Sequence, residues 1–396
     1  MDTRTPGAPP FTFTTPPRIV VEWGAATNGR LATEAARLGK RPLIVASSSL
    51  AANGALQPVL EALGGVGLAV QVHTGVPPEP DLIALQRCID AVADSGADSV
   101  IAIGGGSVLD VAKAAAALMG TGHPAQAYFD GNATVPEQSR LPILTVPTTA
   151  GTGSEVTWVG VFTDKAAKRK ASIRGGSMMP AVAVLDAALT LTCPRTVTIH
   201  SGMDAFVQAL EAYTSNGANP LTDSLAREAA TLTSYHTLAT LDRTPGDRPA
   251  REAMALGGLM AGLALNTARL GLVHGLAHPV GALTGAAHGL VCALLLLPVM
   301  RYNAEAAADK YAQLARDLMG SEVATLPDRT AAAALMDVLQ LHLRDIMELP
   351  ERLRDIGLTR SALERVADES LVSGSTKANP RPVSRDDALA VLEDCY

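Results

Sequence analysis

The sequence predicts an α/β N-terminal half built on a parallel sheet, followed by an all-α C-terminal half. Two observations support this expectation. Up to residue 188, short apolar runs alternate with helical patterns, as in parallel sheets whose two faces are covered by helices. From residue 190 onward the pattern is helical throughout. We therefore expect two domains, residues 1–188 and 189–396.

The bulk composition fits a globular protein and excludes some partners. Of the 396 residues 47% are hydrophobic, and they are mostly aliphatic because aromatic residues make up only 3%. The net charge of −7 argues against nucleic-acid or anionic-membrane partners. The apolar run at residues 290–300 is too short to span a bilayer.

The N-terminus and the cysteines bear on the compartment. The lead-in MDTRTPGAPPFTFTTPP has no apolar segment of the kind that a signal peptide needs. The four cysteines lie far apart without a zinc-ribbon spacing, so we expect free thiols in a cytoplasmic protein.

The first half contains the expected strands and their connecting helices. The run PLIVA at 42–46 and the run SVIAI at 99–103 are continuously apolar, as strands buried on both faces are. The strands are expected at residues 18–23, 42–46, 67–73, 99–103, 141–146, 158–163 and 181–186, and the helices at 25–38, 56–63, 81–95 and 108–118. A basic turn at residues 165–170 is expected to be a solvated hairpin tip.

The second half is expected to contain helices only, punctuated by proline and glycine turns. They are expected at residues 204–214, 221–241, 251–265, 305–319, 329–347, 360–371 and 385–392.

Two polar loops follow buried strands. Gly104–Ser107 (GGGS) leads from a strand directly into a helix, where free backbone N–H groups and the helix dipole can hold a phosphate. The loop also fits a plain tight turn, and it is not the first-strand G-x-G-x-x-G fingerprint. A Thr/Ser/Gly loop at residues 147–155 follows the next strand. Two such loops at one sheet edge favour a ligand crevice over two Thr/Ser turns.

Asp110 and Lys113 lie three residues apart on the helix that follows the glycine loop. They are either an ion pair on the helix surface or, for Asp110, a group that faces a bound cofactor. The sequence does not decide between the two.

Three of the eight histidines, His274, His278 and His288, fall within residues 270–298, which contain no charged residue. Buried imidazoles need partners, and Asp204 on a separate helix is a candidate. A metal held by one carboxylate and neutral imidazoles would polarise an alcohol or carbonyl oxygen. Beside a dinucleotide crevice, that chemistry is hydride transfer.

These motifs make the chain resemble the iron-containing (group III) alcohol dehydrogenases over nearly its whole length. The matching stretches are GGGSVLDVAK at 104–113, TTAGTGSEVT at 148–157, GMDAFVQALEAY at 202–213, residues 266–298 and NPR at 379–381. The resemblance implies a dehydroquinate synthase-like fold, with an NAD(P)-binding α/β domain, a helical domain, and the metal and substrate in the cleft between. It also implies a cytoplasmic homo-oligomer, commonly a dimer.

The resemblance also implies roles for individual residues. Asp204, His274 and His288 match three of the four metal ligands of the family, and His278 matches its additional active-site histidine. Residues that match the family's cofactor-binding positions are Gly105, Gly106, Ser107, Asp110, Thr148, Thr149, Ser154 and Lys170, with Asp110 near the nicotinamide.

Two departures from the family pattern carry information. Gln208 stands where the family has its fourth ligand, a histidine, and a neutral amide oxygen binds Fe²⁺ or Zn²⁺ less well than imidazole does. Gln208 would then ligate weakly through oxygen or donate a hydrogen bond to the substrate. Ser47 stands where many NAD-preferring members have an aspartate for the ribose, so NADP is permitted but not required.

The leading hypothesis is an NAD(P)-dependent oxidoreductase of a small alcohol and its aldehyde or ketone, with His278 as proton relay and Asp110 and Gln208 as further catalytic candidates. Its metal assistance is weakened or replaced because of Gln208. One alternative is a metal-independent reductase of an oxoacid or other acidic carbonyl compound, similar to the maleylacetate reductases. The other is a nucleotide-binding relative without catalytic activity.

Overall fold

The computed structural model describes residues 10–396, apart from the side chains of Asp345 and Ile346. Most of the proline- and threonine-rich lead-in, residues 1–9, therefore lies outside the described residues. The chain forms two compact units. The sheet unit is Thr15–Ser201 with Thr240–Leu259, and the helical unit is residues 10–14 with Gly202–Ala239 and Met260–Tyr396. Residues 189–201 and 240–259, which the sequence-based division places in the second domain, thus group with the sheet.

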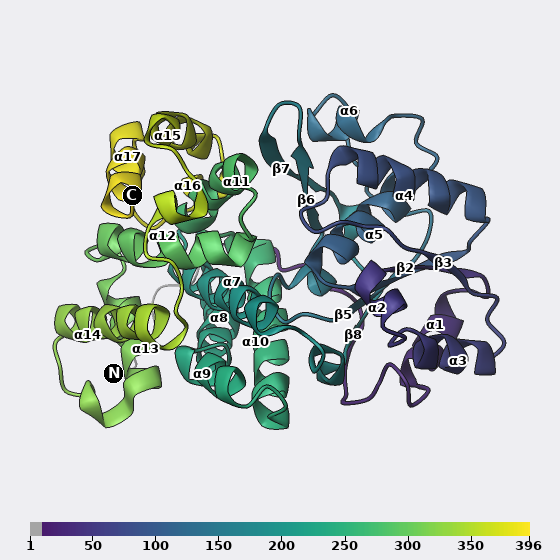
Figure 1. Cartoon of the computed structure of the whole chain (residues 1–396), viewed down its shortest axis with the longest axis horizontal. Helices are drawn as coiled ribbons and strands as arrows, with labels where there is room; N and C mark the ends of the chain where they lie inside the picture. Colours follow the sequence, from purple (N-terminus) through teal and green to yellow (C-terminus); the bar gives the residue numbers. More distant parts are fainter. Residues whose placement is uncertain (1–9) are drawn as a thin grey trace. The chain divides into compact units, whose positions relative to one another are not determined.

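The sheet unit contains a six-stranded sheet in which every neighbouring pair is parallel (Figure 1). This confirms the predicted sheet, and the strand order is β1-β8-β5-β4-β2-β3. The strands are β1 Ile19–Val21, β2 Pro42–Ala46, β3 Gln71–His73, β4 Ser99–Gly104, β5 Ile143–Pro147 and β8 Val182–Leu185.

Both faces of this sheet are covered, which explains the continuous apolar runs of β2 and β4. Leu43 and Val45 of β2 pack on one side, and Ile44 and Ala46 pack on the other. The helices α1 Arg30–Leu38, α2 Ser48–Ala52 and α3 Gln57–Gly65 line one face, and α4 Leu82–Ser95, α5 Gly106–Leu118 and α6 Ala125–Phe129 line the other.

The strand order reverses direction between β2 and β4. After β2 the chain enters α2 on one face of the sheet, and after β4 it enters α5 on the opposite face. The carboxyl ends of two such strands form the point at which doubly wound sheets bind ligands. The predicted GGGS loop lies at this point, at the end of β4.

A separate antiparallel hairpin, β6 Val159–Asp164 and β7 Arg169–Arg174, follows β5. The predicted strand at 158–163 is thus outside the main sheet. Short 3-10 turns, Ser154–Val156, Gly176–Met178 and Ala187–Thr190, join these segments.

The helical unit confirms the predicted all-α half. Helix α11 packs against α12, α15 and α16. The helices of the C-terminal half are α7 Arg195–Thr214, α8 Pro220–Leu232, α9 Tyr235–Arg243, α10 Arg248–Ala268, α11 Leu272–Thr284, α12 His288–Asn303, α13 Ala308–Met319, α14 Asp328–Leu341, α15 Leu363–Leu371, α16 Gly374–Lys377 and α17 Arg385–Asp394, with α7, α9 and α10 crossing between the units. Short 3-10 segments are Gly320–Glu322, Leu353–Ile356 and Arg360–Ala362, and His342–Ile346 is a π-helical turn.

The single helix predicted at residues 221–241 is wrong, because the structure has two. Helix α8 ends at Leu232, its C-cap Thr233 donates its hydroxyl to the carbonyl of Ala229 at 2.7 Å, and α9 starts at Tyr235.

Within the described residues, no single helix is long and apolar enough to cross a membrane. Helices α10 and α11 together have the length and apolar composition of a membrane span, but the chain bends by 103° at their junction.

Candidate active site

Asp204, Gln208 and Glu211 lie on one face of helix α7, at positions i, i+4 and i+7. Each of these residues is at most 4% exposed. Buried polar side chains are costly unless they have partners, so the partners of each indicate its role.

Glu211 fixes the beginning of α11. The backbone N–H of Val273 donates to Glu211 Oε1 at 2.6 Å, and that of Leu272 donates to Asn379 Oδ1 at 3.2 Å. Both bonds satisfy amides that a helix N-terminus leaves without an intrahelical acceptor. A Cβ at Gly271 would lie 2.7 Å from Glu211 Oε1, so this close approach requires glycine.

The same carboxylate orients His274. The Nδ1 atom of His274 lies 2.7 Å from Glu211 Oε2, and because a carboxylate only accepts, Nδ1 is the donor. The Nε2 atom then faces Asp204 Oδ1 at 3.3 Å. A histidine held by a carboxylate through one nitrogen, with the other nitrogen turned to a cluster of donors, is typical of a metal ligand.

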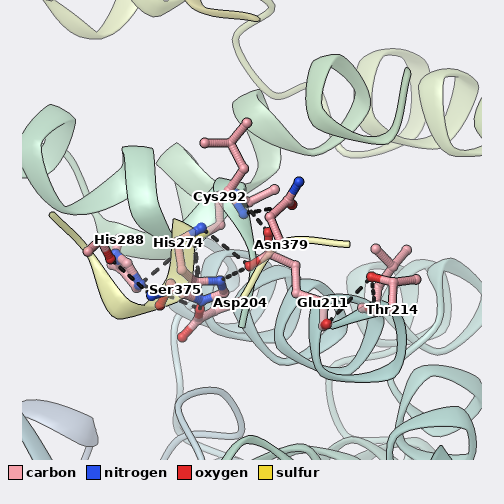
Figure 2. Close-up of polar contacts among 12 residues, drawn as sticks. Asp204, Glu211, Thr214, His274, His288, Cys292, Ser375 and Asn379 are labelled. Atoms are coloured by element: carbon pink, nitrogen blue, oxygen red, sulfur yellow. Dashed lines mark hydrogen bonds and ion pairs between the residues drawn. The ribbon is translucent and has the colours of Figure 1, made fainter. Parts of the chain in front are cut away.

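Four donor side chains converge at this point (Figure 2). Asp204 comes from α7, His274 from α11, and His288 and Cys292 from the first turns of α12. One ligand atom of each lies within 4.8 Å of the others. The first three residues were predicted as a group from the sequence, whereas Cys292 was not.

The donor set fits a divalent metal. It combines one carboxylate, two imidazoles and a thiol, which are the groups that bind zinc and other borderline metals. In addition, Gln208 Oε1 is buried and accepts no hydrogen bond within the described structure, so it is an unused acceptor next to Asp204. These residues therefore suit the metal that the family resemblance implies.

The charges of the neighbouring side chains keep Asp204 ionised. Burial opposes its ionisation, but the charges of His288 and His274 outweigh burial and lower the pKa of Asp204 from 3.8 to about 2. For His274, burial lowers the pKa, but the charge of Cys292 and hydrogen bonds with Asp204 and Glu211 together raise the pKa well above 6.5. A metal therefore has to displace a proton from His274.

His278 lies beside the cluster, one helical turn after His274. Its ring stacks on that of His288, with centroids 5.5 Å apart and planes at 28°. It is half-buried, and its side chain is not a member of the converging donor set. This placement is compatible with a group that exchanges protons next to the site. The role of His278 as proton relay stays a prediction.

In the sheet unit, the two predicted loops lie against each other. The N–H of Thr148 donates to the carbonyl of Gly104 at 2.9 Å. A Cβ at Gly105 would lie 3.3 Å from Thr149 Cγ2, and a Cβ at Gly106 would lie 2.6 Å from Thr152 Cγ2. Both glycines thus permit a close approach that a larger residue would disturb.

The beginning of α5 is open to an anion. Its N-cap is Gly105, and no side chain caps the first amides of the helix. Ser107 follows in the first turn and is half-buried. A helix N-terminus with free amides attracts phosphate oxygens.

Ser47 lies at the end of β2, next to β4. Its N–H donates to the carbonyl of Ile103 at 3.2 Å, and its hydroxyl accepts from the N–H of Leu50 at 3.2 Å. The hydroxyl therefore caps α2, and it also lies 3.3 Å from the Ser49 hydroxyl, so its own hydrogen is available to a further group when Ser49 is the donor of that pair.

Asp110 and Lys113 form a pair, with Nζ 3.7 Å from Oδ1, but Lys113 is completely buried and does not lie on a helix surface. Asp110 accepts from the Ser154 hydroxyl at 2.5 Å and from the N–H of Val161 at 2.8 Å. The carboxylate is thus tied to the second loop, and its predicted position near the nicotinamide stays a prediction.

Lys113 hydrogen-bonds to the backbone at the end of the second loop (residues 147–155) and just after it. Its Nζ donates to the carbonyls of Ser154 and Val159, both at 2.7 Å, and to Thr157, whose carbonyl lies at 3.0 Å. Burial lowers the pKa of Lys113 to about 8, with Asp110 and Glu155 opposing the shift. From its sequence position Lys113 was predicted only as a partner of Asp110.

Lys170, on β7, forms an ion pair with Glu79. Only 6% of its side chain is exposed, whereas the neighbouring basic side chain of Lys165 is 68% exposed and pairs with Asp81. Of the basic turn, Lys165 is thus solvated as predicted, but Lys170 is not.

Comparisons with known proteins agree with this geometry. The family model described as "Iron-containing alcohol dehydrogenase" matches residues 16–187, and the model "Fe-containing alcohol dehydrogenase family, C-terminal" matches residues 198–396. Lactaldehyde reductase of Escherichia coli (strain K12) is 34% identical over 375 residues, which are 94% of this chain and 97% of that protein. NAD-dependent methanol dehydrogenase of Bacillus methanolicus is 31% identical over 383 residues, covering 96% and 99% of the two chains. The solved structure of an alcohol dehydrogenase from Oenococcus oeni superposes with a TM-score of 0.91 at 31% identity, covering 98% and 100%.

Proposed function

Because the chain belongs to the iron-containing alcohol dehydrogenase family, we propose that it interconverts a small alcohol and its aldehyde or ketone by hydride transfer with NAD(P). The single observation that carries the proposal is the buried set of Asp204, His274 and His288, in which Glu211 fixes the orientation of His274. A site that only stabilised the fold would have no need for three converging donors and an unused amide oxygen.

The sheet unit would bind the cofactor. We assign the pyrophosphate to the free amides of Gly105, Gly106 and Ser107 at the start of α5. Six further residues are proposed to complete the cofactor site, namely Ser47, Asp110, Thr148, Thr149, Ser154 and Lys170. Ser47 can donate to a ribose hydroxyl or to a phosphate without the repulsion that a carboxylate would add, so both NAD and NADP fit.

The helical unit would act on the substrate oxygen. Asp204, His274 and His288 would hold a divalent metal, which supplies Lewis-acid polarisation of the carbonyl when it is bound. Glu211 keeps the Nε2 atom of His274 directed at the metal position. The imidazole of His278 would exchange the alcohol proton, and Gln208 would use its unused oxygen to orient the substrate hydroxyl.

We also propose that the chain works as a cytoplasmic homodimer or higher homo-oligomer. The family resemblance supports the assembly, and the four free cysteines support a reducing compartment. Light scattering of the purified protein would test the assembly.

The test of the proposed function is activity on a panel of small aldehydes with NADH and with NADPH, before and after chelation. We expect turnover that chelation abolishes and that added Zn²⁺ or Fe²⁺ restores. Turnover of acidic carbonyl compounds that survives chelation would instead establish the metal-independent reductase. Cofactor binding without turnover of any carbonyl, with or without added metal, would establish the non-catalytic relative.

A further inference from the structure

The metal set of this chain lacks one imidazole. Gln208 occupies the position on α7, four residues after Asp204, at which the resemblance implies a histidine ligand. Three strong donors remain, and a divalent metal bound by three protein groups alone would be held less firmly than one bound by four. A fourth donor side chain near the other three would compensate for the missing imidazole.

Cys292 supplies one. It follows His288 by four residues on α12, so both side chains lie on the same face of the helix. Its Sγ lies 3.7 Å from His288 Nε2, 3.9 Å from His274 Nε2 and 3.9 Å from Asp204 Oδ1. Cys292 is completely buried, so the sulfur meets these donors and not solvent.

The spacing of the donor atoms is that of a tetrahedral site. A tetrahedron with ordinary zinc–ligand bond lengths has nitrogen–oxygen edges of about 3.4 Å and edges to sulfur of about 3.6 Å. The two nitrogen–oxygen edges here are 3.3 and 3.7 Å, and the three edges to sulfur are 3.7 to 3.9 Å. Each of these five edges is thus within a few tenths of an ångström of the ideal, which places Cys292 Sγ at a ligand position, and a substrate oxygen would add as a fifth ligand, which catalytic zinc accepts.

Gln208 is the weaker candidate for the fourth ligand. Its side chain hydrogen-bonds to Asp204, and because a carboxylate only accepts, the atom that faces Asp204 is the amide nitrogen. The amide oxygen is on the other branch of the side chain. It is also a neutral, hard donor, whereas a thiolate is charged and binds borderline metals tightly.

We propose that Cys292 is the fourth protein ligand of the metal in this chain, and that the resulting Asp204–His274–His288–Cys292 set selects zinc over iron. The proposal rests on the proposed function only in that the helical site holds a metal. Thiolate ligation favours Zn²⁺ because soft donors suit zinc better than they suit Fe²⁺. Asp204 and the Cys292 thiolate together also balance the two charges of the ion, so the ion and its four protein ligands carry no net charge.

The experiment begins with metal-free full-length protein, to which Co²⁺ or Zn²⁺ is added. Co²⁺ bound to a thiolate gives a sulfur-to-cobalt charge-transfer band in the near ultraviolet, which histidine and carboxylate ligands do not give. X-ray absorption of the zinc form distinguishes a sulfur shell at about 2.3 Å from nitrogen and oxygen shells at about 2.0–2.2 Å. Both measurements use the unaltered chain, so they do not depend on the folding of a variant.

Two variants then test the assignment. Cys292→Ser is expected to lose the cobalt band and to bind Zn²⁺ about tenfold more weakly or worse, since loss of even an outer partner of a ligand costs about 10–100-fold. Cys395→Ser is the matched control, because Cys395 is a buried thiol of the same unit that hydrogen-bonds to the carbonyls of Val391 and Leu392 and is not a member of the converging donor set. It is expected to keep the band and the affinity. Gln208→His combined with Cys292→Ser should restore zinc affinity without restoring the band.

The outcomes separate this inference from the proposed function. Metal bound without a sulfur signal, and with equal affinity in Cys292→Ser, overturns the inference and leaves metal-assisted reduction intact. Absence of bound metal in the unaltered chain, with carbonyl reduction that survives chelation, overturns the inference and the metal part of the function together. A sulfur-bound metal in a protein that reduces no carbonyl supports the inference while the proposed function fails.

Discussion

Glu211→Gln separates the orienting role of this carboxylate from its size. The glutamate accepts three hydrogen bonds, from the backbone N–H of Val273 at 2.6 Å, from that of His274 at 3.3 Å and from His274 Nδ1 at 2.7 Å. Glutamine has the same shape, and its oxygen can keep the bond with Val273. Its amide nitrogen, however, is a donor and faces the two donors of His274.

The expected effects have two parts. The His274 ring can bond to the amide nitrogen only if its proton moves from Nδ1 to Nε2, which places a hydrogen on the atom that faces Asp204 and the metal. Loss of a carboxylate behind a metal-binding histidine lowers metal affinity by about 10–100-fold, or about 1.4–2.8 kcal/mol. The backbone N–H of His274 also loses its acceptor, which costs about 1–3 kcal/mol of folding stability in the metal-free protein.

The loss of zinc affinity is measured by competition with a chelating indicator. The loss of folding stability is measured by urea unfolding of the metal-free protein. For zinc affinity the control is Glu155→Gln, because Glu155 is a buried carboxyl that belongs to the sheet unit and is not a member of the converging donor set. If Glu211→Gln binds zinc like the unaltered chain, and ¹⁵N spectra show the same His274 tautomer in both, the orienting role assigned to Glu211 is refuted.

Three further predictions follow from the structure. Gly106→Ala should weaken NAD(P) binding at least tenfold, because its Cβ would lie 2.6 Å from Thr152 Cγ2, and Thr152→Ala should rescue much of the loss; fluorescence titration measures both. Burial, opposed in part by Lys113, raises the pKa of Glu155 from 4.5 to about 7. Between pH 4.5 and pH 7, Glu155 is therefore protonated in the folded state and ionised in the unfolded state. Stability should therefore fall as pH rises from 4.5 through 7, by up to about 3 kcal/mol, and urea midpoints of Glu155→Gln should lack this slope. His278→Asn should lower kcat about 100-fold or more with unchanged zinc content, and an equal loss of zinc would show that His278 is a ligand and not a relay.

The sequence predicted the sheet well because local patterns determine it. The runs at 42–46 and 99–103 were found within one residue of β2 and β4, since strands buried on both faces allow few polar residues. The break between α8 and α9 was missed because no proline or glycine marks it in residues 221–241.

The site was predicted in part. Asp204 and His274 were grouped by their chemistry although 70 positions separate them. Cys292 was missed because a cysteine in an apolar helix has the pattern of a core residue, and its position 88 residues from Asp204 gives no local signal. Glu211 was placed on the same face as Asp204, but its contact with His274 depends on how α7 and α11 pack.

The buried ammonium of Lys113 has a consequence for the thermodynamics of cofactor binding. Its bonds to Ser154, Thr157 and Val159 hold the second loop in one conformation without any ligand. A loop that is already ordered loses little conformational entropy when a nucleotide arrives. Calorimetry of NAD(P) binding should therefore show a small entropic penalty, and Lys113→Met should enlarge that penalty while the contacts proposed between the phosphates and Gly105 and Gly106 remain.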